Sequence, residues 1–261
     1  MPLLSLRPGD QVRVTQDGTV VLMFTDGQGT LTVSAANSPY TVQPPGASSG
    51  SRTTAIISDL SRFLMGKKKN LNYVPLATRG AKQPPRILSP VDGKLLSPPL
   101  LEWGGSDRLR YTVRLFGPVG KVWERADLPR VPLLYPPNAP PLTPGVSYRW
   151  ELEAKDFPIQ RGQFTILSMA EIAAVRENLA ALEPSALAGY PKNTVILLRA
   201  GFLFEHELYA EARKELLTAL SADPDEPNLH VMLGHVYERT SLMDLAAEEF
   251  DEADFLTTRS H

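Results

Sequence analysis

Two consecutive stretches near the C-terminus decide the fold of this chain: TVILLRAGFLFEHELYAEARKELLTALSADPD (194–225) and PNLHVMLGHVYERTSLMDLAAEEFDEADFLTT (227–258). Small and large apolar residues recur in both at a period of 34 residues. Those of the second copy are Leu233, Gly234, Tyr237, Ala246, Phe250 and Ala253, and those of the first are Ala200, Leu203, Tyr209, Ala212, Leu216, Ala219 and the closing Pro224. Small residues let antiparallel helices approach closely, while aromatic residues fill the grooves between neighbouring helix pairs. The period therefore predicts two stacked helical hairpins, at about 193–226 and 227–260.

This pattern resembles the tetratricopeptide repeat, although Arg199 stands where an apolar residue is usual. The resemblance implies that a protein partner binds along a concave face made by the first helix of each hairpin. Matching the register places eight residues on that face: Leu197, Gly201, Phe204, Glu205, Val231, His235, Glu238 and Arg239. Leu197 and Gly201 replace two residues of the carboxylate clamp of chaperone-binding members, so a chaperone tail is not the expected partner. The alternative is that these residues only pack against the preceding helix or the β region.

Helical character begins before the repeats. Ser168 and Glu171 have the spacing of a capping box, in which each side chain bonds the other residue's backbone N–H. We expect this helix to reach about Leu182, with 168–190 forming a degenerate preceding unit or a cap. The whole region 168–261 is rich in Ala, Leu and Glu, which favour helix.

The region 86–167 carries short alternating segments separated by turn residues, and it predicts a β-sandwich. Tyr111–Phe116 and Tyr148–Ala154 alternate most clearly, and Asp92-Gly93 is expected to mark a hairpin. The segments 101–103 (LEW) and 142–154 (LTPGVSYRWELEA) resemble a fibronectin type III or related immunoglobulin-like domain. That resemblance implies a turn at Pro144-Gly145 followed by a strand whose tyrosine enters the core.

The first region, 1–44, predicts a small antiparallel β domain made of hairpins. Its strands are expected at 11–15, 19–24 and 30–33, with turns at Asp17-Gly18 and Asp26-Gly27. The pattern from Leu6 through Pro8-Gly9-Asp10 to Val12 resembles the β domain of FecR-like proteins. Residues 45–85 are expected to be a linker with one helix, Thr54–Met65, and a basic stretch.

Composition limits the functions that the chain can have. The 261 residues are 43% hydrophobic and 21% charged, which is typical of globular proteins, and cysteine is absent. No apolar run reaches the roughly 18 residues of a membrane span, and the start of the chain lacks the pattern of a signal peptide. The order FecR-like, immunoglobulin-like, tetratricopeptide resembles bacterial cell-envelope proteins. This implies a periplasmic or exported protein if a leader was trimmed before Met1, and a cytoplasmic one otherwise.

The net charge of −2 hides a strong segregation along the chain. Residues 57–86 hold seven basic and one acidic side chain, whereas residues 171–261 hold seven basic and seventeen acidic ones. Lys67-Lys68-Lys69 has no aromatic residues interleaved with it, so nucleic-acid binding is not expected. The sequence leaves open whether this basic segment docks on the acidic helical region. It also leaves the oligomeric state open.

Catalytic and metal-binding patterns are missing from the sequence. Of the four histidines, His230 and His235 are five residues apart and do not share one helix face. The 117–121 stretch (GPVGK) lacks the spacing of a phosphate loop, and we expect a hairpin turn there. No histidine lies in the β regions to activate a serine. The expectation is therefore a protein that is not an enzyme and has no cofactor or metal.

These observations predict a multidomain β plus α protein: a small β domain, an immunoglobulin-like sandwich and C-terminal helical hairpins. The leading hypothesis is a protein–protein interaction scaffold that binds through the helical domain. The alternative is a carbohydrate- or cell-wall-binding protein that acts through aromatic residues of the sandwich. Those aromatics are Trp103, Tyr111, Trp123, Tyr135, Tyr148 and Trp150.

Overall fold

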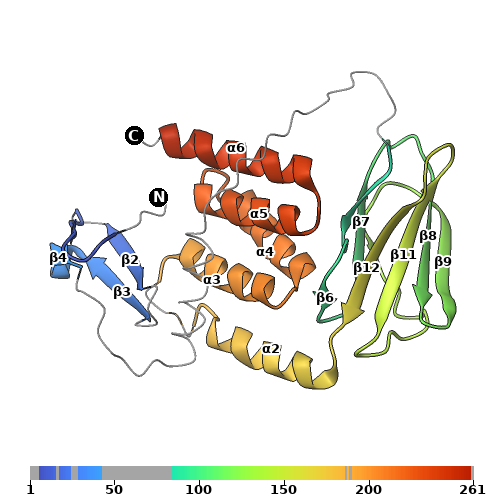
Figure 1. Cartoon of the computed structure of the whole chain (residues 1–261), viewed down its shortest axis with the longest axis horizontal. Coiled ribbons are helices and arrows are strands. Elements are labelled where there is room, and N and C mark those ends of the chain that lie inside the picture. Colours follow the sequence, from blue (N-terminus) through green and yellow to red (C-terminus); the bar gives the residue numbers. More distant parts are fainter. Residues whose placement is uncertain are drawn as a thin grey trace.

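The computed structural model describes residues 6–15, 18–24, 29–42, 84–185, 187 and 190–259. Sheets form the N-terminal and middle regions, and five helices follow, so the chain is β plus α as predicted (Figure 1). The predicted helix Thr54–Met65 and the lysine run 67–69 lie outside the described residues. Among the described residues, no helix is both long and apolar enough to cross a membrane.

The described residues of the N-terminal region form two short antiparallel sheets, and the predicted strands 19–24 and 30–33 are confirmed. One sheet pairs β2 (Thr19–Phe24) with β3 (Gly29–Ser34), and the other pairs β1 (Gln11–Val12) with β4 (Tyr40–Thr41). A 3-10 turn, η1 (Ala35–Asn37), follows β3 and precedes β4 in the chain. The described core here is small and consists of Leu22, Val33 and Val42 with partly buried neighbours.

The middle region contains two sheets. The smaller has the order β10-β7-β5 and is built from β5 (Arg86–Ser89), β7 (Leu100–Gly104) and β10 (Leu133–Leu134). The larger has the order β6-β12-β11-β8-β9, and its strands are β6 (Lys94–Leu95), β8 (Tyr111–Gly117), β9 (Gly120–Leu128), β11 (Ser147–Ala154) and β12 (Gln160–Ile166). All pairs are antiparallel except β6 with β12. The turn between Gly117 and Gly120 joins β8 to β9, which confirms the predicted hairpin.

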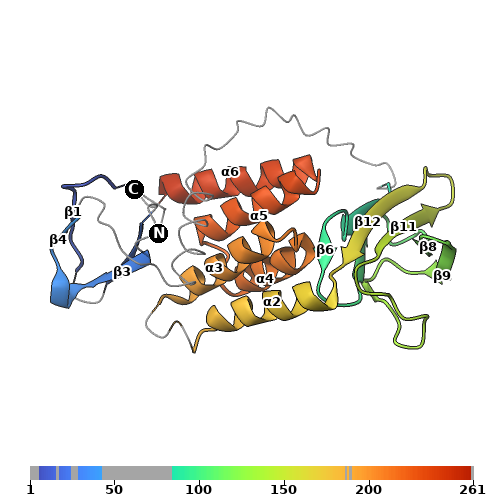
Figure 2. The same ribbon diagram turned by 60° about the horizontal axis from the view of Figure 1, so that its bottom comes forward.

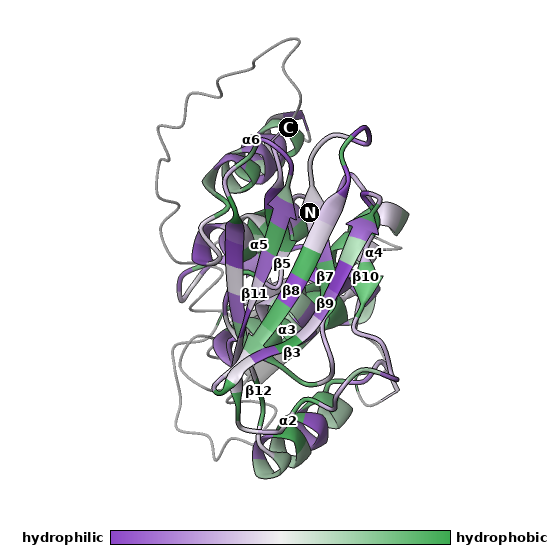
Figure 3. Cartoon of the chain, turned by 90° about the vertical axis from the view of Figure 1, so that its right-hand side faces the viewer, coloured by the Kyte–Doolittle hydropathy of each residue, from purple (hydrophilic) through white to green (hydrophobic). Residues whose placement is uncertain are grey.

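One hydrophobic core lies between the two sheets. Leu101 and Trp103 of the smaller sheet belong to the same buried cluster as Leu115, Trp150 and Phe164 of the larger one. Polar and apolar bands follow one another along the strands, because successive side chains point to opposite faces (Figure 3). We call this the two-sheet region.

The prediction of a hairpin at Asp92-Gly93 is wrong. β5 pairs with β7 and β6 pairs with β12, so the chain passes here from one sheet to the other. Gly93 has φ of 98°, and a Cβ at this position would lie 2.4 Å from the Glu207 carbonyl oxygen. A glycine was needed for close contact with a distant segment rather than for a tight turn.

The five helices follow the predicted order: α2 (Met169–Ala181), α3 (Lys192–Glu205), α4 (Tyr209–Ala222), α5 (Pro227–Arg239) and α6 (Met243–Arg259). The capping box at Ser168 and Glu171 is confirmed. Pro227 begins α5 at a position where its missing N–H costs nothing.

The 34-residue period also appears in backbone geometry. Leu208 N–H donates to the Leu203 carbonyl, and Leu242 N–H donates to the Tyr237 carbonyl. The residues before them, Glu207 and Ser241, have φ of 62° and 61°. The two inter-helix turns are therefore copies of each other.

Small residues lie where the helices cross, as the period predicts. A Cβ on Gly234 would lie 2.6 Å from the Phe250 ring of α6, and Ala212 and Ala246 are fully buried. Arg199 departs from the apolar pattern because its guanidinium pairs with both Glu183 and Glu215, each at 2.8 Å.

The helices dock on the two-sheet region, which lies beside the stack of α3–α6 in both views (Figures 1 and 2). The Lys94 N–H donates to the Glu207 carbonyl and the Leu96 N–H to Glu211 Oε1, each at 2.8 Å. Ion pairs join Arg213 to Glu102 and Arg86 to Asp244. Partly buried apolar contacts accompany them: Val91 and Leu96 pack against the helical core, and Ala210 against the core of the sheets.

Candidate partner-binding site

A cleft of about 560 Å³ lies where the helices meet the two-sheet region. Its walls are β6, α2, the turn from α3 to α4, and the end of α5. We call it the junction cleft. It is lined by Lys94, Leu167, Glu171, Ala174, Val175, Asn178, Phe204, Glu205, His206, Glu207, Tyr209 and Arg239.

The junction cleft brings together three of the eight residues predicted for a concave face. Phe204 and Glu205 come from the end of α3, and Arg239 comes from the end of α5. Phe204 is half-buried, whereas Glu205 and Arg239 are exposed. The C-terminal ends of α3 and α5, the first helices of the two hairpins, thus line the same cleft.

The other five predicted residues do not line this cleft. Leu197 and Gly201 are buried, and Leu197 belongs to the same core cluster as residues of α2. Val231, His235 and Glu238 are half-buried, and the His235 ring packs edge-on against Phe250 with centroids 5.1 Å apart. His235 Nδ1 also lies 3.4 Å from Glu238 Oε2.

Hydrogen bonds and ion pairs hold the polar side chains of the cleft in place. Lys94 Nζ lies 3.1 Å from Glu207 Oε2, and Arg239 Nε donates to the Tyr209 hydroxyl at 3.0 Å. That hydrogen bond raises the pKa of Arg239 above its usual value, with help from the charges of Glu207 and Asp92. Arg239 is therefore charged at neutral pH.

Glu171 is the most firmly held carboxylate of the cleft. Its Oε2 accepts from the Ser168 hydroxyl at 2.7 Å and from the Ser168 backbone N–H at 2.9 Å. These bonds lower the pKa of Glu171. The residue sits in the first turn of α2, where the helix dipole also favours a negative charge.

The repeat register could not reveal half of this site. Lys94 comes from a strand more than a hundred residues earlier in the chain, and Glu171 was recognised only as a helix cap. Tyr209 was assigned to helix packing, and its ring does pack against Phe204 with centroids 5.4 Å apart. Its hydroxyl, however, orients Arg239.

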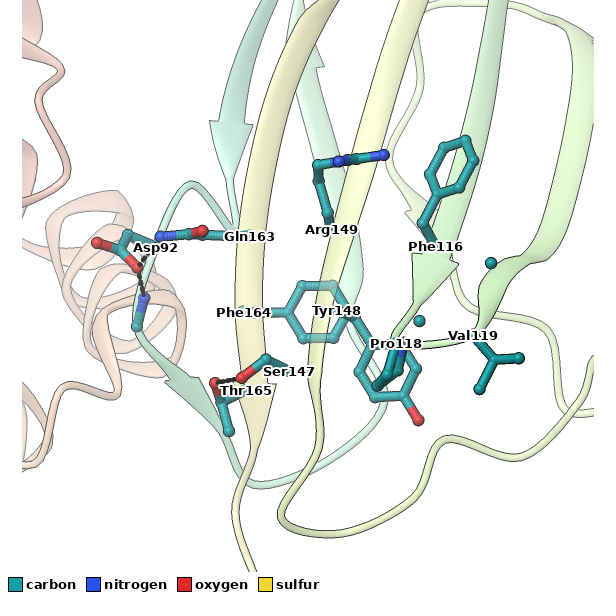
Figure 4. A pocket seen from close by; sticks show the side chains of 13 residues that line it. Asp92, Phe116, Pro118, Val119, Ser147, Tyr148, Arg149, Gln163, Phe164 and Thr165 are labelled. Carbon is teal, nitrogen blue, oxygen red and sulfur yellow. Dashed lines mark hydrogen bonds between the residues drawn. The ribbon is translucent and has the colours of Figure 1, made fainter.

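A second groove, of about 480 Å³, lies on the two-sheet region (Figure 4). Arg149 lies over the Phe116 ring at 4.9 Å from its centroid. Gln163 donates to Asp92 at 3.2 Å, and the hydroxyls of Ser147 and Thr165 are 2.7 Å apart. These polar groups bond to each other, and Val119 at the rim is fully exposed.

The aromatic residues considered for glycan binding are mostly core residues. Five of them are at most 6% exposed: Trp103, Tyr111, Tyr135, Tyr148 and Trp150. Trp123 is half-buried and packs edge-on against Tyr135 with centroids 5.6 Å apart.

Metal-ligand geometry is absent from the part of the chain that the structure describes, where no three His, Asp or Glu side chains gather suitably. His230 lies between Glu249, at 2.7 Å from Nδ1, and the Pro224 carbonyl, at 2.8 Å from Nε2. Its neighbours make it a link between α5, α6 and the preceding loop.

No protein-family model matches the chain, and no curated protein is significantly similar to it in sequence. The junction cleft is lined by residues from both the two-sheet region and the helices, and its polar side chains bond to one another.

Proposed function

We propose that this chain is a non-enzymatic protein–protein interaction scaffold that holds its partner in the junction cleft. The observation that carries the proposal is that the cleft lies where the α3–α4 turn is tied to β6, by the Lys94 N–H on the Glu207 carbonyl and by the ion pair of the same two residues. A site whose groups are already in place loses less conformational entropy when it binds.

The proposal includes tetratricopeptide-type hairpins in the helical region. Support comes from the turns 34 residues apart with matching hydrogen bonds and φ angles. The close fit of Gly234 against Phe250 supports the same reading. Tetratricopeptide repeats bind partners, which is the functional part of this resemblance.

We also propose that the two-sheet region is an immunoglobulin-like sandwich of the fibronectin type III kind. The Tyr148 hydroxyl, at the start of β11, accepts a hydrogen bond from the Thr143 backbone N–H at 2.8 Å. A tyrosine bonding to backbone a few residues upstream is typical of the tyrosine corner of such domains. The FecR-like identity of residues 1–44 and the cell-envelope setting remain predictions from resemblance.

Affinity capture with a matched pair of α2 variants tests the proposed function. Ala173 and Ala174 are both exposed on α2, but only Ala174 lines the junction cleft. Full-length Ala174→Trp fills the cleft, and full-length Ala173→Trp adds the same bulk beside it. From an extract of the native cells, we expect a partner retained by the wild type and Ala173→Trp and lost by Ala174→Trp. A partner retained equally by both variants would place recognition elsewhere.

The carbohydrate-binding alternative receives less support. It rested on six aromatic residues of the sheets, and five of these belong to the core. In the second groove, the half-buried Phe116 could stack on a sugar ring, but Arg149 already lies over this aromatic ring.

A further inference from the structure

We infer that the junction cleft selects a segment of the partner in which a cationic side chain, lysine or arginine, lies next to an apolar one. This inference rests on the proposed function and adds the chemistry of the partner. It follows from three properties of the cleft: its balance of charge, the helix ends that face it and its apolar floor.

The balance of charge is negative. The lining includes the carboxylates of Glu171, Glu205 and Glu207 against the cations Lys94 and Arg239. Lys94 is paired with Glu207, and Arg239 lies in the field of Glu207 and of nearby Asp92. No ion pair joins Glu171 or Glu205 to a cation within the described ranges. Glu171 already accepts two hydrogen bonds from Ser168 and lies in the field of Lys94, so Glu205 is the carboxylate most available to an incoming cation.

Two helix C-termini reach the cleft. The helix α3 ends at Glu205, α5 ends at Arg239, and both of these residues line it. The last carbonyls of a helix carry partial negative charge, which favours a cation nearby. The partial negative charge at these helix ends therefore favours a bound cation, as the carboxylates of Glu171 and Glu205 do.

The floor of the cleft is apolar. Leu167 and Val175 are only 3% and 4% exposed, and Ala174 and the half-buried Phe204 extend this surface. An apolar side chain of the partner would bury its area here, while the neighbouring cation meets the carboxylates. A purely acidic segment would instead bring like charges together.

A phage library of random decapeptides, selected on the immobilised full-length chain, tests this inference. The clones that count are those that lose binding to Ala174→Trp and keep binding to Ala173→Trp. We expect lysine and arginine next to leucine, isoleucine or phenylalanine to be enriched among them. Enrichment of aspartate and glutamate, no charge preference, or no such clones would each overturn the inference.

A charge-neutral variant gives a second readout on the selected peptides. Glu205→Gln removes a cleft charge, and Glu252→Gln removes one on the exposed face of α6. We expect Glu205→Gln to weaken binding about threefold, the scale of a partly exposed ion pair, and Glu252→Gln to leave it unchanged. Equal affinities for both variants would overturn the role of Glu205.

The two proposals fail in different ways. If capture of the native partner depends on Ala174 but the selected peptides are acidic, the scaffold function stands and the cationic partner is wrong. If the native partner is captured equally by both α2 variants, the cleft itself is the wrong site.

Discussion

The two helical hairpins have the same register and the same turn geometry but different surroundings. In the first, the Glu207 carbonyl at the turn accepts the Lys94 N–H from a strand. In the second, no backbone N–H of the described residues outside the helices and strands donates to the carbonyl of Ser241, the matching residue. Glu211 and Arg213 of α4 also contact the two-sheet region. The second hairpin contacts that region through a different position, Asp244 of α6, which pairs with Arg86. A repeat thus specifies how each hairpin folds, and the individual residues on its outside decide what docks there.

The largest effect is expected from breaking the contact at the first hairpin. Gly93→Ala would place a Cβ 2.4 Å from the Glu207 carbonyl oxygen and 2.7 Å from the Tyr209 ring, at a φ of 98°. We expect the free energy of unfolding to fall by about 3 kcal/mol in urea titrations, since strain and a backbone clash combine.

Gly145→Ala is the matched control for this variant. Gly145 also has positive φ, 79°, but nothing lies within 4 Å of its Cβ position. Its loss should be about 1 kcal/mol from backbone strain alone. Equal losses for the two glycines would show that the docking contact adds nothing.

An intermediate effect is expected from the second hairpin, whose two helices cross closely at Gly234. Gly234→Ala would place a Cβ 2.6 Å from the Phe250 ring. Overpacking of this kind costs about 1–3 kcal/mol, offset by up to about 1 kcal/mol from the better helix propensity of alanine. We expect a net loss of about 1 kcal/mol in urea titrations.

The double variant Gly234→Ala with Phe250→Leu isolates that contact. Because leucine leaves room for the new methyl group, the cost of Gly234→Ala should disappear in the Phe250→Leu background. A cost that is the same in both backgrounds would contradict the assignment of this crossing to the Gly234–Phe250 pair.

The smallest expected effect is a pH dependence from Glu211 of the first hairpin. Burial raises the pKa of the Glu211 carboxyl from its ordinary value of 4.5, and the Leu96 N–H opposes this only in part. Above pH 4.5 the folded chain holds a proton that the unfolded chain releases, so this group's contribution to stability falls as pH rises toward the folded pKa.

Glu211→Gln removes the titration. Relative to wild type, its free energy of unfolding should increase as pH rises above 4.5 and level off once the folded pKa is passed, in urea titrations from pH 4 to 8. Glu252→Gln, on the exposed face of α6, serves as the control with the same chemical change. A difference between Glu211→Gln and wild type that does not vary with pH would refute the prediction.

The sequence predicted most of the local structure because local structure follows local periodicity. The alternation from Tyr111 to Phe116 gave a strand, and the spacing of Ser168 and Glu171 gave a helix start. Contacts between distant segments were not predictable in this way. Asp92-Gly93 carries the composition of a tight turn, yet its glycine serves the approach to Glu207.

The candidate site was predictable only on the side that the repeats provide. Register gave Phe204, Glu205 and Arg239 because equivalent positions of first helices share one face. The same rule wrongly placed Leu197 on the binding face. Leu197 is buried in a core shared with α2. Lys94 and Glu171 line the cleft because the helices dock on the two-sheet region. The repeat period within the helices carries no information about that docking.

The strand β12 ends at Ile166, and α2 begins three residues later at Met169. Between them the Leu167 N–H donates to the Leu95 carbonyl at 3.0 Å, next to Lys94. At this end of the junction cleft, the backbone hydrogen bonds of one sheet therefore hold the start of α2 beside β6. Because β6 and β12 are neighbours in the sheet, their spacing sets how far apart the walls lie at this end, and with it the thickness of a segment that fits between them.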